Sequence, residues 1–273
     1  MDFSVLISVY YKENPQFFQE ALDSILEQTL LPNEIIIVKD GVLTAELNQI
    51  VDNFNHSNIS KKVIELKSNL GLGRALAIGL SECSNSLVAR ADSDDINLVN
   101  RFEVQLNAFK MDSTLSIVGA QIAEFYQVDN ERIFESKRSV PVAHSDIVKF
   151  SKKRNPFNHM TVMFKKEDIV KCGGYKHKPS YEDYDLWMRV LNAGLKTSNS
   201  PEVLVHARAG INMAERRGGI KYAHSLFKMR KDFFNSGYIS LKDFFVSSTA
   251  TTAFALFPSS LRNKIYKNIL HSK

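Results

Sequence analysis

Only two cysteines occur among the 273 residues, and Cys83 and Cys172 form neither a CxxC nor a Cys/His pattern. This scarcity argues against a disulfide framework or a cysteine-based zinc site and is typical of a reducing compartment. The sequence also lacks the roughly 18 consecutive apolar residues that a membrane-spanning helix needs. Its nearest approach, residues 244–257, is shorter and rich in serine and threonine. The first 15 residues, MDFSVLISVYYKENP, lack the basic start and long apolar stretch of a signal peptide.

The composition describes a folded, basic chain. Hydrophobic residues make up 44% of it, enough to bury a large core. Lys and Arg number 35 against 30 Asp and Glu, which gives a formal net charge of +5. A positive balance favours contact with nucleotide phosphates, nucleic acid or a lipid surface, and charge alone does not rank the three.

Short apolar runs alternate with helical patterns through the first half of the chain. The predicted strands are 3–9, 34–41, 61–67 and 86–92, and the predicted helices are 15–29, 44–55 and 73–83. Such alternation indicates an α/β fold with a mainly parallel, twisted sheet covered on both faces. Ligands of these sheets bind beyond the carboxyl ends of the strands. Asp40, Asn69 and Asp92 end or follow predicted strands, so we expect them to line one edge of the sheet.

The second half has a different pattern. Residues 115–138 resemble a strand pair, residues 158–175 a strand followed by a helix, and residues 180–194 an amphipathic helix. From about residue 216 the chain is predicted to be helical, basic and aromatic.

Three carboxylates stand together in ARADSDD. Asp92, Ser93 and Asp94 form a DxD pattern, and Asp95 follows directly. Two interpretations are open at this stage. The carboxylates hold Mg²⁺ or Mn²⁺ together with substrate phosphates, or Asp94 or Asp95 caps a helix that carries Phe102 and Leu106.

A second acidic pair, Glu182-Asp183, opens the helix in YEDYDLW. The dipole at a helix start favours the ionised carboxylate, and an ionised, positioned carboxylate can act as a general base. Acids in a first helical turn are also ordinary helix stabilisers, which is our interpretation of Asp185.

Four separated motifs together resemble a known family. They are ISVYYKENPQFFQEALDSILEQTLLPNEIIIVKDG, NLGLGRALAIGL, ARADSDD and YEDYDLWMRV. Their order and spacing are similar to those of bacterial family-2 glycosyltransferases of the capsule, exopolysaccharide and O-antigen branch, over roughly residues 3–210. The resemblance implies the glycosyltransferase-A fold, with a catalytic domain over 1–215 and a helical extension over 216–273. The nucleotide-binding half of that domain would span about 1–112 and the acceptor half about 113–215.

The resemblance also implies roles for residues at the donor site. Ser8, Val9, Tyr10 and Glu13 would surround the nucleotide, and Asp40 would bond the uracil edge. Asn69, Gly71 and Arg74 would approach the nucleoside and phosphates.

Further roles concern the acidic motifs. Asp92, with Ser93 beside it, would contact the ribose, Asp94 would ligate the metal with Asp92 beside it, and Asp95 would steady the loop or touch the sugar. Asp183 would be the catalytic base, next to Glu182. Together these roles imply an inverting, metal-dependent transferase that uses a nucleotide sugar, with UDP favoured, and a lipid-linked oligosaccharide acceptor.

Some residues remain ambiguous. Arg216 and Arg217 are either a clamp on the diphosphate or a solvated basic turn. Asn158 and His159 are candidates for sugar contacts, and His206 for an extra metal ligand, although a histidine beside an apolar strand is more often structural.

The end of the chain combines aromatic and basic residues. Phe244, Phe245 and Phe254 are followed by Arg262 and several lysines, without an acid after Asp243. This composition suits an anionic membrane surface, and we expect a cytoplasmic protein held peripherally at the inner membrane. The alternative is a tail that packs on the domain or on a second subunit.

Two other functions are weighed. GLGRALA imitates a dinucleotide-binding fingerprint, yet it follows the third predicted strand rather than the first, which argues against an NAD(P)-dependent oxidoreductase. A non-catalytic nucleotide-sugar-binding protein would be expected to lack Asp94 or Asp183, and both are present. No nucleic-acid-binding module is recognisable, so no such partner is expected.

Overall fold

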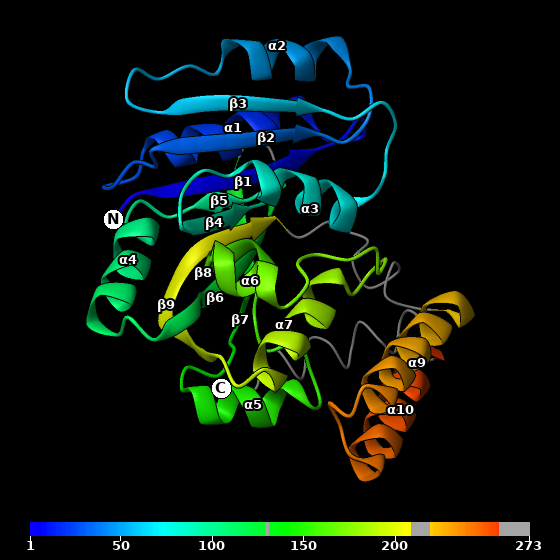
Figure 1. Ribbon diagram of the computed structural model, residues 1–273. Coiled ribbons are helices and arrows are strands. Elements are labelled where there is room, and N and C mark those ends of the chain that lie inside the picture. The colour runs from blue at the N-terminus through cyan, green and yellow to red at the C-terminus, as the bar shows by residue number, and fades with distance from the viewer. Residues whose placement is uncertain (129–130, 209–218, 257–273) are drawn as a thin grey trace.

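The computed structural model describes residues 1–128, 131–208 and 219–256 (Figure 1). Among these residues one large sheet has the strand order β3-β2-β1-β4-β8-β6-β9-β5, and β7 pairs with β6. Helices cover both of its faces, as the sequence predicts.

The first half is the predicted parallel sheet. Strands β1 (Phe3–Val9), β2 (Glu34–Lys39), β3 (Ser60–Glu65) and β4 (Leu87–Ala91) all run in one direction. Every residue of β2 and β4 is buried, which explains their continuous apolar sequences. The connecting helices are α1 (Pro15–Leu26), α2 (Ala45–Asn53) and α3 (Leu72–Glu82).

Local capping fixes where the first two helices begin. The Asn14 side chain accepts a hydrogen bond from the backbone N–H of Gln16, and Pro15 occupies the first helical position. Thr44 caps α2 in the same way through the N–H of Leu47.

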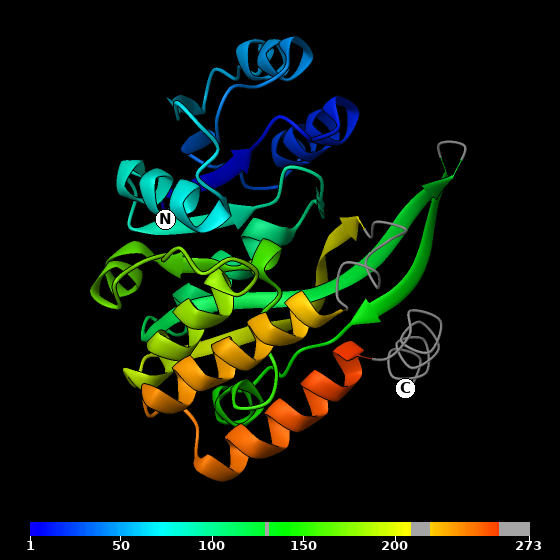
Figure 2. The same ribbon diagram turned by 90° about the vertical axis from the view of Figure 1, so that its right-hand side faces the viewer.

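The second half adds antiparallel and long strands. A short β5 (Ile96–Asn97) leads to α4 (Arg101–Met111) and then to β6 (Leu115–Val128) and β7 (Glu131–Arg138). The predicted strand pair is thus confirmed, and Figure 2 shows this hairpin extending away from the body. Strand β8 (Met163–Lys165) lies antiparallel between β4 and β6, and β9 (Lys196–Arg208) runs parallel to β6.

Shorter helices connect these strands. They are α5 (His144–Ser151), the 3₁₀ turn η1 (His159–Thr161), α6 (Lys166–Lys171) and α7 (Glu182–Asn192). Trp187 of α7 is fully buried in the core that α3 and α7 form on one face of the sheet. The predicted helix 180–194 is therefore confirmed within two residues at each end.

The described part of the C-terminal extension is a pair of helices, α9 (Ile220–Asn235) and α10 (Leu241–Leu256), which lie side by side (Figure 2). Met229 and Phe233 of α9 pack with Tyr184 and Met188 of α7 in one apolar cluster. Phe244 of α10 packs against the same cluster, so the described part of the tail packs on the domain, as the alternative interpretation expects. Within the described ranges, none of the helices combines the length and apolar character that a membrane crossing requires.

Candidate active site

The expected edge of the sheet is formed where β1, β2 and β4 end. Val9 is buried at the end of β1, Ser8 is half-buried, and Tyr10 is exposed beyond the strand. Because β1 lies between β2 and β4, the segments that follow all three strands open onto the same edge (Figure 1).

Asp40 organises the loop that follows β3. Its two carboxylate oxygens accept hydrogen bonds from the backbone N–H groups of Leu70, at 2.7 Å, and Gly71, at 3.1 Å. The Asn69 side chain donates to the Asp40 carbonyl at 3.3 Å. Gly41 allows this approach, since it has a φ of +92° and a Cβ there would lie 2.7 Å from the Asn69 nitrogen. The predicted donor residues Asp40, Asn69 and Gly71 are therefore together, while the Arg74 side chain is exposed.

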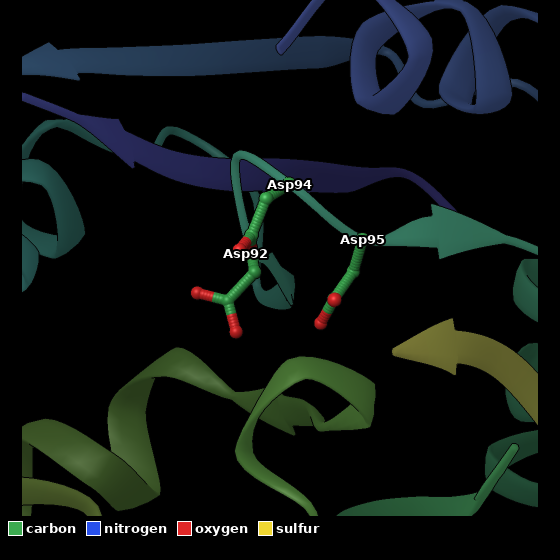
Figure 3. A group of neighbouring side chains, drawn as sticks. All are labelled: Asp92, Asp94 and Asp95. Atoms are coloured by element: carbon green, nitrogen blue, oxygen red, sulfur yellow. The ribbon is translucent and has the colours of Figure 1, made fainter. Parts of the chain in front are cut away.

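The acidic cluster lies just past β4. Each of Asp92, Asp94 and Asp95 places a carboxylate oxygen within 4.8 Å of the others (Figure 3). Burial, together with repulsion from Asp92 and Glu13, raises the pKa of Asp94 to about 7. Burial also raises the pKa of Asp95 well above its ordinary value.

The helix-cap interpretation of this cluster is wrong. Strand β5 follows the acids directly, and α4 begins only at Arg101, with Asn100 at its cap position. Asp94 and Asp95 therefore stabilise no helix start.

Contacts from distant segments hold the acidic loop. The buried Arg90 guanidinium forms an ion pair with Asp92. Ser93 donates to the Glu13 carboxylate at 2.6 Å, which ties the loop to the segment after β1. The backbone N–H of Arg208 donates to Asp95 at 2.8 Å, and the Arg208 side chain donates to the Asp94 carbonyl at 3.0 Å.

The arrangement fits a hard divalent cation. Mg²⁺ and Mn²⁺ prefer carboxylate oxygens, and the cluster offers three such groups in reach of one another. One oxygen of Asp95 is buried without a hydrogen-bond partner, and Asp94 carries an elevated pKa. A cation would stabilise the ionised form of both groups.

Asp183 lies in the first turn of α7. The Asn155 side-chain amide donates to it at 2.6 Å. Burial raises the pKa of Asp183, although the N–H of Tyr184 and the Asn155 amide act in the opposite direction. Burial likewise raises the pKa of Glu182, its neighbour. A carboxylate whose pKa is raised by burial is a stronger base than an exposed one.

The first turns of α3 and α7 pack closely. A Cβ on Gly73 would lie 2.4 Å from the Lys176 carbonyl oxygen and 3.1 Å from the Glu182 Cβ. A Cβ on Gly71 would lie 3.9 Å from the His177 ring. The loop held by Asp40 and the start of α7 are thus neighbours, which places the predicted donor residues beside the predicted base.

The ambiguous polar residues have mainly structural contacts. Asn158 is buried and donates to the Ala120 carbonyl at 2.8 Å. His159 is half-buried, lies 3.0 Å from the Tyr175 hydroxyl, and packs edge-on against Trp187.

His206 packs edge-on against Phe134 and is not part of the described carboxylate group. Arg216 and Arg217 fall outside the described residues.

Sequence reasoning missed four residues of this region: Glu20, Arg90, Asn155 and Arg208. Arg90 lies within the motif ARADSDD, and Asn155 lies three residues before Asn158, a residue that the sequence had singled out. Arg208 contacts Asp95 from 113 positions away in the sequence and also bonds Glu20 at 2.8 Å. Pairings at such separations leave no local pattern.

Two bacterial glycosyltransferases are similar to this protein in sequence over almost its whole length. The UDP-Gal:alpha-D-GlcNAc-diphosphoundecaprenol beta-1,3-galactosyltransferase of Escherichia coli is 42% identical over 268 residues, which cover 98% of this chain and 96% of that protein. The amylovoran biosynthesis glycosyltransferase AmsE of Erwinia amylovora is 35% identical over 268 residues, covering 97% of this chain and 98% of that protein.

Solved structures share the fold. Staphylococcus aureus TarS 1-349, in complex with UDP-GlcNAc, has a TM-score of 0.62 at 18% identity, with 86% of this chain and 67% of that one covered. This chain spans 40% of the longer TarS structure. The mannosyltransferase PcManGT from Pyrobaculum calidifontis, in complex with GDP-Man and Mn2+, has a TM-score of 0.65 at 16% identity. The match covers 98% of this chain and 79% of that one.

A family model described as Glycosyl transferase family 2 matches residues 4–173, well over half of the chain. This chain, with its glycosyltransferase-A fold, belongs to glycosyl transferase family 2.

Proposed function

We propose that this glycosyltransferase moves a sugar from a UDP-sugar to a hydroxyl of a lipid-linked saccharide, with inversion, during bacterial surface polysaccharide synthesis. The observation that carries the proposal is the 42% identity, along 98% of the chain, to a galactosyltransferase whose name gives UDP-Gal and a diphosphoundecaprenol-linked sugar. UDP-galactose is accordingly the first donor to test.

Asp94, with Asp92 beside it, would hold a Mg²⁺ or Mn²⁺ ion. Such a cation neutralises the negative charge that grows on the leaving diphosphate. The donor segments around Ser8, Glu13 and the Asp40 loop would bind the nucleotide at the same edge.

Asp183 would accept the proton of the acceptor hydroxyl as its oxygen forms the new bond to the anomeric carbon. The bond from that carbon to the diphosphate breaks in the same step, and UDP leaves with the bonding electrons. Because the attack comes from the face opposite the leaving group, an α-linked donor gives a β-glycoside. The half-buried position of Asp183, bonded to Asn155, supports this role.

The test is calorimetric titration of UDP into the purified protein with Mn²⁺ and then with EDTA, using NAD as the control ligand. A transfer assay with UDP-galactose and a GlcNAc-diphospho-lipid follows. Metal-dependent UDP binding with transfer supports the proposal. NAD binding would instead favour an oxidoreductase, and UDP binding without transfer to any lipid-linked acceptor would favour a non-catalytic binding protein.

We also propose that the outer face of the α9–α10 pair contacts the anionic cytoplasmic membrane surface, where a lipid-linked acceptor would lie. Phe227, Phe234 and Phe245 are exposed there, the last at 60%, and Phe244 contacts the rings of all three. Exposed lysines accompany them at 228, 231 and 242. Aromatic and cationic side chains on one surface suit adsorption to anionic lipids.

Flotation with vesicles of anionic phospholipid tests this surface. The double variant Phe227→Ser and Phe245→Ser should float less than the wild type. Met111→Ser is the matched control, because Met111 is an 89% exposed apolar residue on α4. Equal flotation of all three proteins would refute the membrane contact, and a dimer in solution would assign the face to a second copy.

A further inference from the structure

Helix α9 carries a buried arginine at its contact with the rest of the molecule. Arg230 is 2% exposed. Its guanidinium donates to the Lys152 carbonyl at 3.0 Å, to the Lys153 carbonyl, and to the Tyr184 hydroxyl at 3.3 Å. The Arg230 guanidinium thus bonds two residues that lie just before Asn155, and it also bonds Tyr184, the residue that follows Asp183.

A second contact from α9 holds the loop that leads into α7. Asp232 forms an ion pair of 2.6 Å with Lys178 and accepts a hydrogen bond of 3.4 Å from the Tyr181 hydroxyl. Between these two partners lies Ser180, the one non-glycine residue in the described ranges with a positive φ, +75°. A strained residue of this kind persists where its surroundings over-determine its conformation.

The two contacts converge on one hydrogen bond. Arg230 bonds the backbone carbonyls of residues 152 and 153, just before Asn155, and Asp232 bonds the side chains of Lys178 and Tyr181, in the loop just before Asp183. Asn155 and Asp183 are themselves joined at 2.6 Å. Asn155, which donates this bond, and Asp183, which accepts it, therefore each lie close in sequence to residues that α9 binds.

We infer that Arg230 and Asp232 are positioning residues, through which the α9–α10 pair sets the orientation of the Asp183 carboxylate. This inference rests on the proposed function, because it takes Asp183 to be the base. It assigns the pair a role beyond membrane contact: the element that would face the lipid also aligns the base that would receive the acceptor's proton.

Burial of the Arg230 guanidinium supports a positioning role rather than a role in merely packing α9 against the rest of the protein. Its described hydrogen bonds go to two carbonyls and a hydroxyl, none of them anionic. Removing a charge from water without an ionised partner is costly, and an apolar side chain would join two helices without that cost. The guanidinium instead supplies several donors in a fixed plane, which specifies the relative placement of the segments it binds.

The test compares Asp232→Asn, Lys178→Met and Arg230→Lys with the wild type. Asn235→Ala is the matched control, since Asn235 is an exposed residue of the same helix, outside both contacts and outside the proposed membrane surface. Misplacement of a catalytic group by about 1 Å costs roughly 100-fold in rate, so we expect kcat to fall by about 10- to 100-fold. The Kd for UDP with Mn²⁺ should stay within about twofold, because the nucleotide edge lies on other elements.

Hydrogen exchange provides a second readout that does not depend on turnover. The peptide covering 178–187 should exchange faster in Asp232→Asn and Lys178→Met, and the peptide covering 150–157 in Arg230→Lys, while peptides from β1 and α3 should not change. Exchange equal to the wild type in both peptides would overturn the inference. So would wild-type kcat in all three variants, whereas a wild-type protein without transfer activity would count against the proposed function itself.

Discussion

The side-chain amide of Asn155 donates a 2.6 Å hydrogen bond to the carboxylate of Asp183, 28 positions later in the chain. A carboxylate that accepts a hydrogen bond is stabilised in its ionised form and held in one orientation. Asn155 therefore lowers the pKa of a group whose pKa burial raises, and it fixes where that group points.

This balance predicts a shift in the pH profile of Asn155→Ala. The base acts only when it is deprotonated, so kcat should decline as the pH falls through the pKa of Asp183. Loss of the amide removes an influence that lowers this pKa, and the acidic limb of the kcat profile should move to higher pH. Asn192→Ala, at the exposed end of the same helix, serves as the control. Superimposable limbs for wild type and Asn155→Ala would contradict the prediction.

Asp183→Asn should separate binding from chemistry. The amide has nearly the same shape but does not accept the proton, so we expect kcat to fall by at least about 100-fold. The Kd for UDP with Mn²⁺ should be unchanged in calorimetry. Asp146→Asn, an exposed acid on α5, is the control. Retained turnover in Asp183→Asn would remove this residue as the base.

Asp94→Ala should remove the metal dependence of UDP binding. Calorimetric titrations with Mn²⁺ and with EDTA should become the same, because the central carboxylate of the cluster is gone. The melting temperature of the metal-free protein should not fall, since the substitution relieves repulsion among Asp92, Asp94 and Glu13. Asp52→Ala, an exposed acid on α2, should behave as wild type. A persisting difference between Mn²⁺ and EDTA would show that the cation binds elsewhere.

Gly73→Ala should disturb the contact between α3 and α7. In an ordinary helix interior this substitution stabilises by about 1 kcal/mol. Here the added Cβ would lie 2.4 Å from the Lys176 carbonyl oxygen, so the loop before Glu182 must move. We expect a lower melting temperature and a lower kcat. Ser81→Ala at the other end of α3 should alter neither, and a melting temperature above that of the wild type would show that the loop accommodates the methyl group.

Much of the fold follows from local patterns. Strands β1, β2 and β4 are recognisable because burial on both faces demands continuous apolar residues. The predicted second strand extends two residues past the observed end of β2, at Lys39, because Asp40 and Gly41 belong to the turn. The start of α4 could not be placed, since the two-residue strand β5 is fixed by its pairing with β9 rather than by its own sequence.

The α/β class, the parallel sheet and the acidic side chains of the site could all be predicted from local sequence, because hydrophobic periodicity and short motifs are properties of neighbouring residues. The contacts that hold those acids could be seen only in the folded protein: Arg90 pairs with Asp92, the Arg208 N–H donates to Asp95, and the Asn155 amide donates to Asp183. Buried polar groups must find partners wherever the fold provides them, and the fold brings together residues as far apart as Asp95 and Arg208.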